Sequence, residues 1–248
     1  MRIFQVDAFT RSRFTGNPAT VVLDAEGCDD AMLRDIAREF GHTEVAFVLP
    51  PADAGHDLRL RFFNAHKEAP FVGHATVAAH TVLLELGRRG LGSCRQRSGT
   101  GVIEVVARRE SGAAATIEFR QSAPELDAPL PLKTTLRVAE ALGLPGTRLH
   151  EGLPARVSRK GSARLLVPAA DAQALDGLAP QFDTLLALGR ELGVEGFFTF
   201  AFLRDGGGPR TESRMFCPAI GIPEDPVSGN AHAMLAAYLF DAGLLGRG

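Results

Sequence analysis

The chain has 248 residues, a length that fits one large domain or two small ones. Hydrophobic residues make up 45% and charged residues 23%, which is ordinary for a globular protein. The net charge of −2 and the pI near 6.4 exclude the basic surface that a nucleic-acid partner needs. No apolar run approaches membrane-spanning length, and the N-terminus lacks the apolar block of a signal peptide. We therefore expect a cytoplasmic protein with no membrane partner.

The cysteines and histidines indicate no metal or disulfide framework. Cys28, Cys94 and Cys217 are odd in number and far apart, and the seven histidines show no ligand spacing such as His-Glu-x-x-His. We therefore expect no metal.

In chain order, hydrophobic periodicity predicts short strands alternating with a few helices. The expected strands are 2–8, 19–23, 45–49, 58–63, 102–107, 115–119, 155–159, 163–167 and 197–203. The expected helices are 30–40, 74–86, 135–142, 182–192 and 230–242. Polar stretches rich in Gly and Pro predict loops at 50–57, 87–101, 120–134 and 205–211. Of these, 87–101 reads as a basic surface connection, "QSAPELDAPLPLK" as an interdomain linker and "DGGGPR" as a hairpin loop.

Two pairs of segments indicate an internal repeat. The stretch 33–48 resembles 185–200, and each is an amphipathic helix stopped by a glycine and followed by an apolar strand. The stretch 73–87 likewise resembles 229–243, from glycine to glycine. Chance similarity of apolar helices is the alternative, but both pairs recur in the same order. The pattern favours an N-terminal half over 1–120 and a C-terminal half over 130–248.

The second pair of helices is apolar almost all round, which predicts that both are buried. The start of a buried helix still needs partners for its free backbone N–H groups, and it carries partial positive charge. Gly73-His74 and Ser228-Gly229-Asn230 stand at these starts, where glycine lets a ligand approach the backbone. Each start could therefore hold a carboxylate or phosphate. If the halves face each other, the two starts would converge on one cleft.

Three residues could carry proton-transfer chemistry. Glu44 opens the apolar strand "EVAFVLP", where poor solvation would raise its pKa toward a useful range; a solvated carboxylate at a strand end is the alternative. His74 at a helix start could be a neutral donor and acceptor, or simply a histidine that satisfies the helix end. Asp225 could act as a second acid or base, or form a turn before the helix, where either Asp225 or Ser228 could be the cap.

Other polar residues have interpretations that need no catalytic role. Asn17 lies in "FTGNPAT", where an Asn-Pro turn explains it without function. His80 and His232 fall within the buried helices and read as core or boundary histidines. Cys217 near the second helix start is weak evidence for a nucleophile.

Four stretches, taken together, resemble the phenazine-biosynthesis F-like (PhzF-like) isomerase family. They are "VDAFTRSRFTGNPATVVLD", "IAREFGHTEVAFVLP", "LRFFNAHKEAPFVGHATVAAH" and "RMFCPAIGIPEDPVSGNAHAMLAAYL". They occur in the family's order and cover much of residues 1–87 and 212–243. The set is specific, although any one stretch alone would be weak.

The resemblance implies a diaminopimelate epimerase-like α/β (α+β) fold. In it, two similar halves each wrap a curved mixed β-sheet or barrel around a central buried helix, with the active site in the cleft between them. It also implies a homodimer, a small anionic carboxylate substrate, and chemistry without metal or organic cofactor. The family's catalytic glutamate falls on Glu44, and its histidine and aspartate partners fall on His74 and Asp225. The substrate-contacting groups fall on Gly73, Ser228, Gly229 and Asn17.

Two departures from the family pattern bear on function. Asn230 stands where the phenazine enzyme has serine, which could change substrate choice. The family also continues past "LFDAGLLGRG" with strands that pack back on the first half, so truncation of this chain is an open alternative.

Three functions remain open at this point. The leading one is an isomerase in which Glu44 removes a proton and returns it at another carbon. The second is a glutamate-based amino-acid epimerase or racemase; the version that uses two thiols is disfavoured, because neither helix start carries a cysteine beside it. The third is a non-catalytic protein that binds a small molecule.

Overall fold

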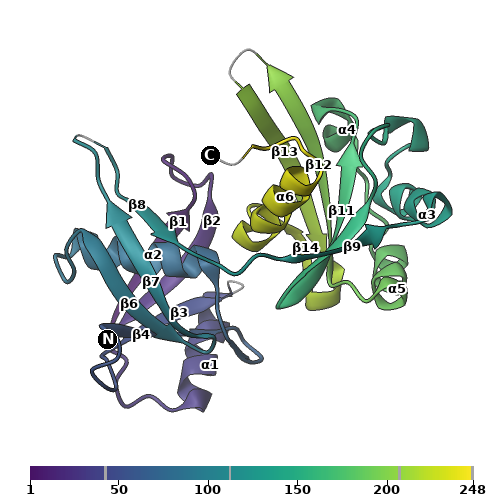
Figure 1. The fold of residues 1–248 in the computed structure, drawn as a ribbon. Coiled ribbons are helices and arrows are strands. Elements are labelled where there is room, and N and C mark those ends of the chain that lie inside the picture. Colours follow the sequence, from purple (N-terminus) through teal and green to yellow (C-terminus); the bar gives the residue numbers. More distant parts are fainter. Residues whose placement is uncertain (42–43, 112, 206–207, 247–248) are drawn as a thin grey trace. The chain divides into compact units, whose positions relative to one another are not determined.

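The computed structural model describes residues 1–41, 44–111, 113–205 and 208–246, and it divides into two compact units. Unit 1 is Met1–Gln121 and unit 2 is Ser122–Gly248. Each unit has its own sheet and its own central helix (Figure 1). The fold is mixed α/β, as expected from the alternation of strands and helices.

In unit 1 the described residues form one sheet in the order β1-β2-β3-β4-β6-β7-β8, with β5 paired to β4. The strands are β1 (Arg2–Ala8), β2 (Asn17–Leu23), β3 (Val45–Leu49), β4 (Leu58–Phe63), β5 (Glu68–Ala69), β6 (Gly92–Ser98), β7 (Gly101–Arg108) and β8 (Thr116–Phe119). The helices are α1 (Asp30–Phe40) and α2 (Gly73–Glu85). The pairs β2–β3 and β4–β6 are parallel, and the others are antiparallel.

The sheet of unit 1 curls around α2, which packs against β1, β2, β3 and β8. Successive side chains of a β-strand point to opposite faces of the sheet. Ala46 and Val48 of β3 therefore pack on the α2 side, and Val45 and Phe47 pack on the α1 side. Continuous burial of β3 follows from this sandwiching between two helices.

The one strongly polar side chain within the buried part of α2 is satisfied by a neighbouring strand. His80 is fully buried, and its Nε2 lies 2.9 Å from Gln96 Oε1 on β6. The Arg89 guanidinium contacts the other ring nitrogen. Since Arg89 can only donate, Nδ1 accepts and Nε2–H donates to Gln96, which requires a neutral ring. Burial is the main cause that lowers the pKa of His80 to about 4.

In unit 2 the sheet runs β14-β13-β12-β11-β10-β9 through the described residues. The strands are β9 (Glu125–Pro129), β10 (Arg156–Lys160), β11 (Ser162–Ala169), β12 (Gly196–Asp205), β13 (Gly208–Cys217) and β14 (Ile222–Asp225). The helices are α3 (Leu132–Leu142), α4 (Ala172–Asp176), α5 (Phe182–Leu192) and α6 (Gly229–Asp241), with 3₁₀ turns η1 (Gly146–Arg148) and η2 (Pro218–Ile220). One face of this sheet packs on α3, α4 and α5, and the other packs on α6.

The helices of the repeat correspond closely in length and place. α2 and α6 each follow a short strand, β5 or β14, that folds back onto its predecessor. The parallel pair β2–β3, connected through α1, has its counterpart in the parallel pair β11–β12, connected through α5. The expected repeat is therefore present in the connectivity of the described residues.

The expectation that α6 is buried on all sides is wrong for one face. Ala231, Met234 and Tyr238 are buried, whereas Phe240 is 46% exposed and His232 is also exposed.

Two predicted connections contain strands. The basic stretch 87–101 includes β6, and the expected linker 121–133 includes β9, which pairs with β10. Hydrophobic periodicity missed β6 because its buried positions include the polar residue Gln96. It missed β9 because proline interrupts the pattern there. The predicted hairpin at "DGGGPR" joins the antiparallel pair β12–β13, but Gly206 and Gly207 lie outside the described residues.

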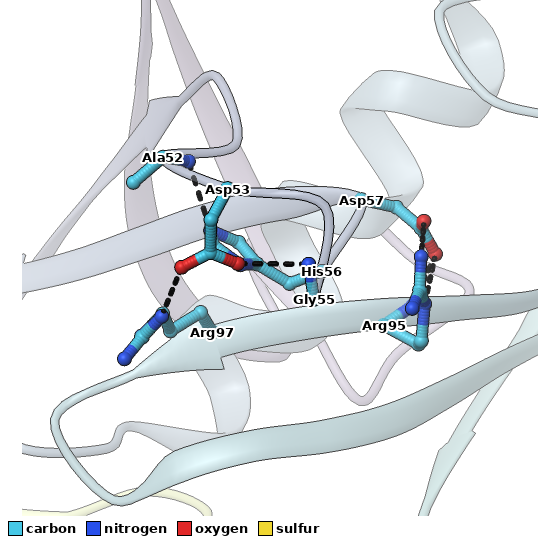
Figure 2. Close-up of polar contacts among 7 residues, drawn as sticks. All are labelled: Ala52, Asp53, Gly55, His56, Asp57, Arg95 and Arg97. Carbon is cyan, nitrogen blue, oxygen red and sulfur yellow. Dashed lines mark hydrogen bonds and ion pairs between the residues drawn. The ribbon is translucent and has the colours of Figure 1, made fainter.

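The predicted loop 50–57 is held to β6 by a group of polar contacts (Figure 2). His56 Nε2 accepts from the Ala52 backbone N–H at 3.1 Å, and Nδ1 lies 3.1 Å from Asp53 Oδ1. Arg97 of β6 donates to the other oxygen of Asp53 at 2.8 Å. The pKa of Asp53 is lowered, first by the Gly55 backbone N–H, with burial opposing. The loop is therefore ordered by its own side chains.

Candidate active site

Two of the predicted site residues, Asn17 and Glu44, lie at one end of the sheet of unit 1. Asn17 begins β2, where it pairs with Ala8, the last residue of β1. Parallel pairing of Thr20 with Val45 places Glu44, the residue before β3, at the same end as Asn17. Asn17 is buried at 5% exposure and Glu44 is half-buried. The pairing register thus brings together two polar residues that are far apart in the sequence.

The start of α2 follows β4 and β5 along the chain. β4 runs antiparallel to β3, so it finishes at Phe63, opposite Val45. β5 then folds back onto the last residues of β4, and α2 begins three residues after β5 ends, at Gly73. Gly73 and His74 are half-buried there. We call Asn17, Glu44, Gly73 and His74 the unit 1 half-site.

The first turn of α2 suits an anion. Its N-cap is Val72, which provides no side-chain hydrogen bond, and the turn contains no acidic residue. The partial positive charge of the helix end is therefore not offset by the helix's own side chains. A Cβ added at Gly73 would meet only Phe119 Cζ at 3.7 Å, so packing within the protein does not require glycine. The absence of a side chain at this position is better explained by access to the backbone.

The second group of predicted residues lies at the start of α6. Ser228 is the N-cap and accepts from the Ala231 backbone N–H at 3.4 Å. Asp225 ends β14, and its Oδ1 accepts from the Val227 N–H at 3.3 Å. The structure therefore assigns the cap to Ser228 and a local turn contact to Asp225. Asp225, Ser228, Gly229 and Asn230 are all half-buried, and together they form the unit 2 half-site.

Asn230 anchors the start of α6 to the sheet of unit 2. Its Nδ2 donates to Ser162 Oγ at 3.2 Å and to the Lys160 carbonyl oxygen at 3.4 Å. Both acceptors flank the turn between β10 and β11. The amide nitrogen of Asn230 is therefore engaged within unit 2.

A buried arginine beside the unit 2 half-site was not found from the sequence. Arg164 on β11 lies in the same row as Gly196 on β12, and it is only 8% exposed. A Cβ at Gly196 would be 2.6 Å from Cys217 Sγ and 3.0 Å from Arg164 Cδ. Glycine is thus needed for Arg164 to pass over β12 toward Cys217. The signal in the sequence was the charge inside the strand "SARLLVPA".

The pKa of the Cys217 thiol depends on its burial and on the charged residues close to it. Burial is the main cause that raises the pKa of this thiol to about 11, with Arg164 opposing and Asp225 and Glu195 reinforcing the effect. Cys217 is fully buried and stays protonated near neutral pH. The structure therefore gives no support to a thiolate nucleophile at this position, in agreement with the weak sequence signal.

The histidines outside the half-sites behave as the sequence indicated. His80 is a satisfied core residue, and His232 is an exposed boundary residue whose Nδ1 lies 2.7 Å from the Ser228 carbonyl oxygen. Among the described residues no cluster of three His, Cys, Asp or Glu side chains could hold a metal ion. In the same part of the chain, no helix is both long and apolar enough to span a bilayer.

Two sheet-and-helix units with the same connectivity define a duplicated α/β protein. Comparison with known proteins agrees with that class. Residues 6–247 match the PhzC-PhzF family, described as phenazine biosynthesis-like protein. The chain belongs to this family, and by that membership it is an isomerase.

Two curated relatives are named as isomerases. YddE of Escherichia coli strain K12, an uncharacterized isomerase, is 38% identical over 96% of this chain and 78% of its own length. The trans-2,3-dihydro-3-hydroxyanthranilate isomerase of Pseudomonas chlororaphis is 29% identical over 94% of this chain and 78% of its own length.

Solved structures share the fold. A Bacillus anthracis phenazine biosynthesis protein of the PhzF family superposes with a TM-score of 0.85 at 27% identity, covering 96% of this chain and 80% of that one. A predicted epimerase, PA4716 of Pseudomonas aeruginosa, gives a TM-score of 0.80 at 31% identity and covers 100% and 84%. The expected family and fold class are thereby confirmed.

Proposed function

We propose that this protein is a cofactor-independent isomerase of a small unsaturated carboxylic acid, with Glu44 as its base. The observation that carries the proposal is the register of unit 1, which brings Glu44 and Asn17 to one end of the sheet. The start of α2, which has no side-chain cap, supports it. A half-buried carboxylate and a helix start without a side-chain cap, both in unit 1, are suited to move a proton on an anionic substrate.

In the proposed reaction Glu44 removes a proton from a carbon activated by a neighbouring double bond. The electron pair shifts along the unsaturated system, and the protonated Glu44 returns the proton at another carbon, so the substrate and the product have the same composition. Backbone N–H groups at Gly73 hold the substrate's carboxylate, and His74 steadies the charge that develops. The family resemblance implies that Asp225, Ser228, Gly229 and Asn230 are further residues that position the substrate.

The test follows small unsaturated and amino carboxylic acids by NMR in D₂O, including trans-2,3-dihydro-3-hydroxyanthranilate. A double-bond shift seen with the wild type and lost in Glu44→Gln would support the isomerase. Glu39→Gln is the matched control, since Glu39 is an exposed carboxylate on α1 of the same unit. Turnover that survives in Glu44→Gln would contradict the role of this residue.

A glutamate-based epimerase is the second candidate, and the similarity to a predicted epimerase favours keeping it. The same experiment separates the two functions, because an epimerase exchanges the α-hydrogen of an amino acid for deuterium without moving a double bond. The two-thiol version is disfavoured by the burial and raised pKa of Cys217. Ligand binding that is unchanged by Glu44→Gln, with no turnover of any acid, would favour a binding protein instead.

We further propose a homodimer located in the cytoplasm, on the strength of the family resemblance. Light scattering on the purified chain measures its mass in solution and tests the dimer directly. A mass of one chain across the accessible concentration range would contradict it.

A further inference from the structure

The loop between β1 and β2 is the part of the unit 1 half-site that the repeat does not explain. In unit 2 the corresponding hairpin β10–β11 closes through Gly161 alone, because Lys160 pairs with Ser162. In unit 1 the pairing ends at Ala8 and Asn17, which leaves residues 9–16 as the connection. The loop therefore extends from the end of the sheet that carries Asn17 and Glu44.

The backbone of this loop is strained at two aromatic residues. Phe9 has φ 62° and Phe14 has φ 66°, both in the left-handed region that bulky side chains avoid. The Gly161 turn of unit 2 also has a positive φ, of 72°, but glycine adopts it without steric cost. Strained positions of this kind persist where the surrounding structure fixes them, and they cluster at functional sites.

Contacts within the loop fix its conformation. The Phe14 backbone N–H donates to Asp7 Oδ2 at 2.8 Å, and the hydroxyls of Thr10 and Thr15 are hydrogen-bonded at 2.6 Å. A Cβ at Gly16 would come within 2.3 Å of the Ala8 carbonyl oxygen, so only glycine fits where the loop rejoins β2. The loop is thus pre-organised, and it holds the Phe14 side chain at 92% exposure.

We propose that Phe14 is a specificity-determining residue of this enzyme, and that its ring packs on the unsaturated carbon skeleton of the substrate. The inference rests on the proposed function, since it gives that substrate an aromatic contact in addition to the carboxylate contact at α2. A rigid loop that presents an aromatic ring toward solvent at the site end has its surface available before the substrate arrives. Arg11 and Arg13, both exposed, precede Phe14 in the same loop, and their charges favour an anionic substrate.

The experiment compares Phe14→Gly with Phe9→Gly in the full-length protein. Both changes remove a bulky residue from the left-handed region, so both variants should melt at or above the wild-type temperature. Only Phe14→Gly should lose function, with kcat/KM on the isomerised acid falling about tenfold, mostly through KM. The kcat/KM of Phe14→Leu should lie between the values for Phe14→Gly and Phe9→Gly. Wild-type kcat/KM in Phe14→Gly, or an equal loss in Phe9→Gly, would overturn the proposal.

A binding measurement keeps this proposal separate from the proposed function. If the wild type turns over none of the acids, the isomerase proposal fails, and 2-aminobenzoate is then titrated while the Phe14 ring signals are followed by NMR. Shifted ring signals, with a Kd about tenfold weaker in Phe14→Gly, would support the contact. Unshifted ring signals, absence of binding, or a Phe14→Gly variant that changes only the mass in solution would overturn it.

Discussion

The side-chain nitrogen of Asn230 donates to the Ser162 hydroxyl, and this contact joins the first turn of α6 to the turn between β10 and β11. We expect Asn230→Ala to lower the free energy of unfolding by about 1 kcal/mol, because a partly buried hydrogen bond is lost. Ser162→Ala should cost less, since the Lys160 carbonyl oxygen remains as an acceptor. Urea unfolding measures both, and equal stability of Asn230→Ala and wild type would contradict the anchoring role.

Asp225 and its neighbour Glu224 offer a matched pair of carboxylates on β14. Asp225 pairs with Met215, which faces α6, whereas Glu224 accepts from Arg214 at 2.8 Å on the other side of the strand. We expect Asp225→Asn to lower kcat about 100-fold on the isomerised acid, because the substrate would be held less precisely for proton transfer. Glu224→Gln should keep kcat near that of the wild type. Similar losses in both variants would show that β14, and not the Asp225 carboxylate, matters.

Burial of His80 makes stability depend on pH. Its pKa of about 4 lies below the value of the unfolded chain, so the unfolded state takes up the proton first as pH falls. The stabilisation is complete above pH 6.5 and is lost between there and pH 4, by about 3 kcal/mol in total.

In His80→Gln this contribution should disappear, so the difference in unfolding free energy between pH 7.5 and pH 4.5 should shrink. His66→Gln, at an exposed position, is the control and should leave the wild-type difference unchanged. A His80→Gln variant with the full wild-type difference would place the pH dependence elsewhere.

Gly196 should tolerate no side chain. A Cβ there would collide with Cys217 Sγ and crowd Arg164 Cδ, so Gly196→Ala is expected to destabilise unit 2 by about 1–3 kcal/mol. Gly177→Ala, whose nearest contacts are at 3.9 Å, should have little effect. Adding Cys217→Ala to Gly196→Ala should recover part of the loss, and thermal unfolding of the three variants measures it. No recovery would mean that Arg164, and not the thiol, causes the clash.

The contacts of His56 in Figure 2 should control hydrogen exchange of backbone amides in the 50–57 loop. Since the Ala52 N–H donates to His56 Nε2, we expect His56→Ala to speed hydrogen exchange of this amide about tenfold at constant pH. Arg95→Ala, which breaks the Asp57 ion pair at the other side of the loop, should leave the Ala52 amide close to wild type. Equal effects of both variants would argue for general loosening of the loop.

Local patterns in the sequence were sufficient for most single elements. The helix 30–40 and the strand 45–49 begin and end where predicted, because their periodicity, the Asp29 cap and Gly41 are local signals. Strand β6 could not be predicted in this way, since its inward positions include Gln96, a polar residue. The buried side-chain oxygen of Gln96 finds its hydrogen-bond partner in His80, which comes from a distant segment.

The sequence alone determined the family, the repeat and the residue types expected to act, because these are written in ordered motifs and hydrophobic periods. The tertiary structure decided which of them meet within each unit. Pairing of Ala8 with Asn17 and of Thr20 with Val45 places Asn17 and Glu44 together, and the path over Gly196 brings Arg164 to Cys217. Hydrophobic periodicity describes side chains along one strand. Strand register and cross-strand packing instead join segments that are distant in the chain.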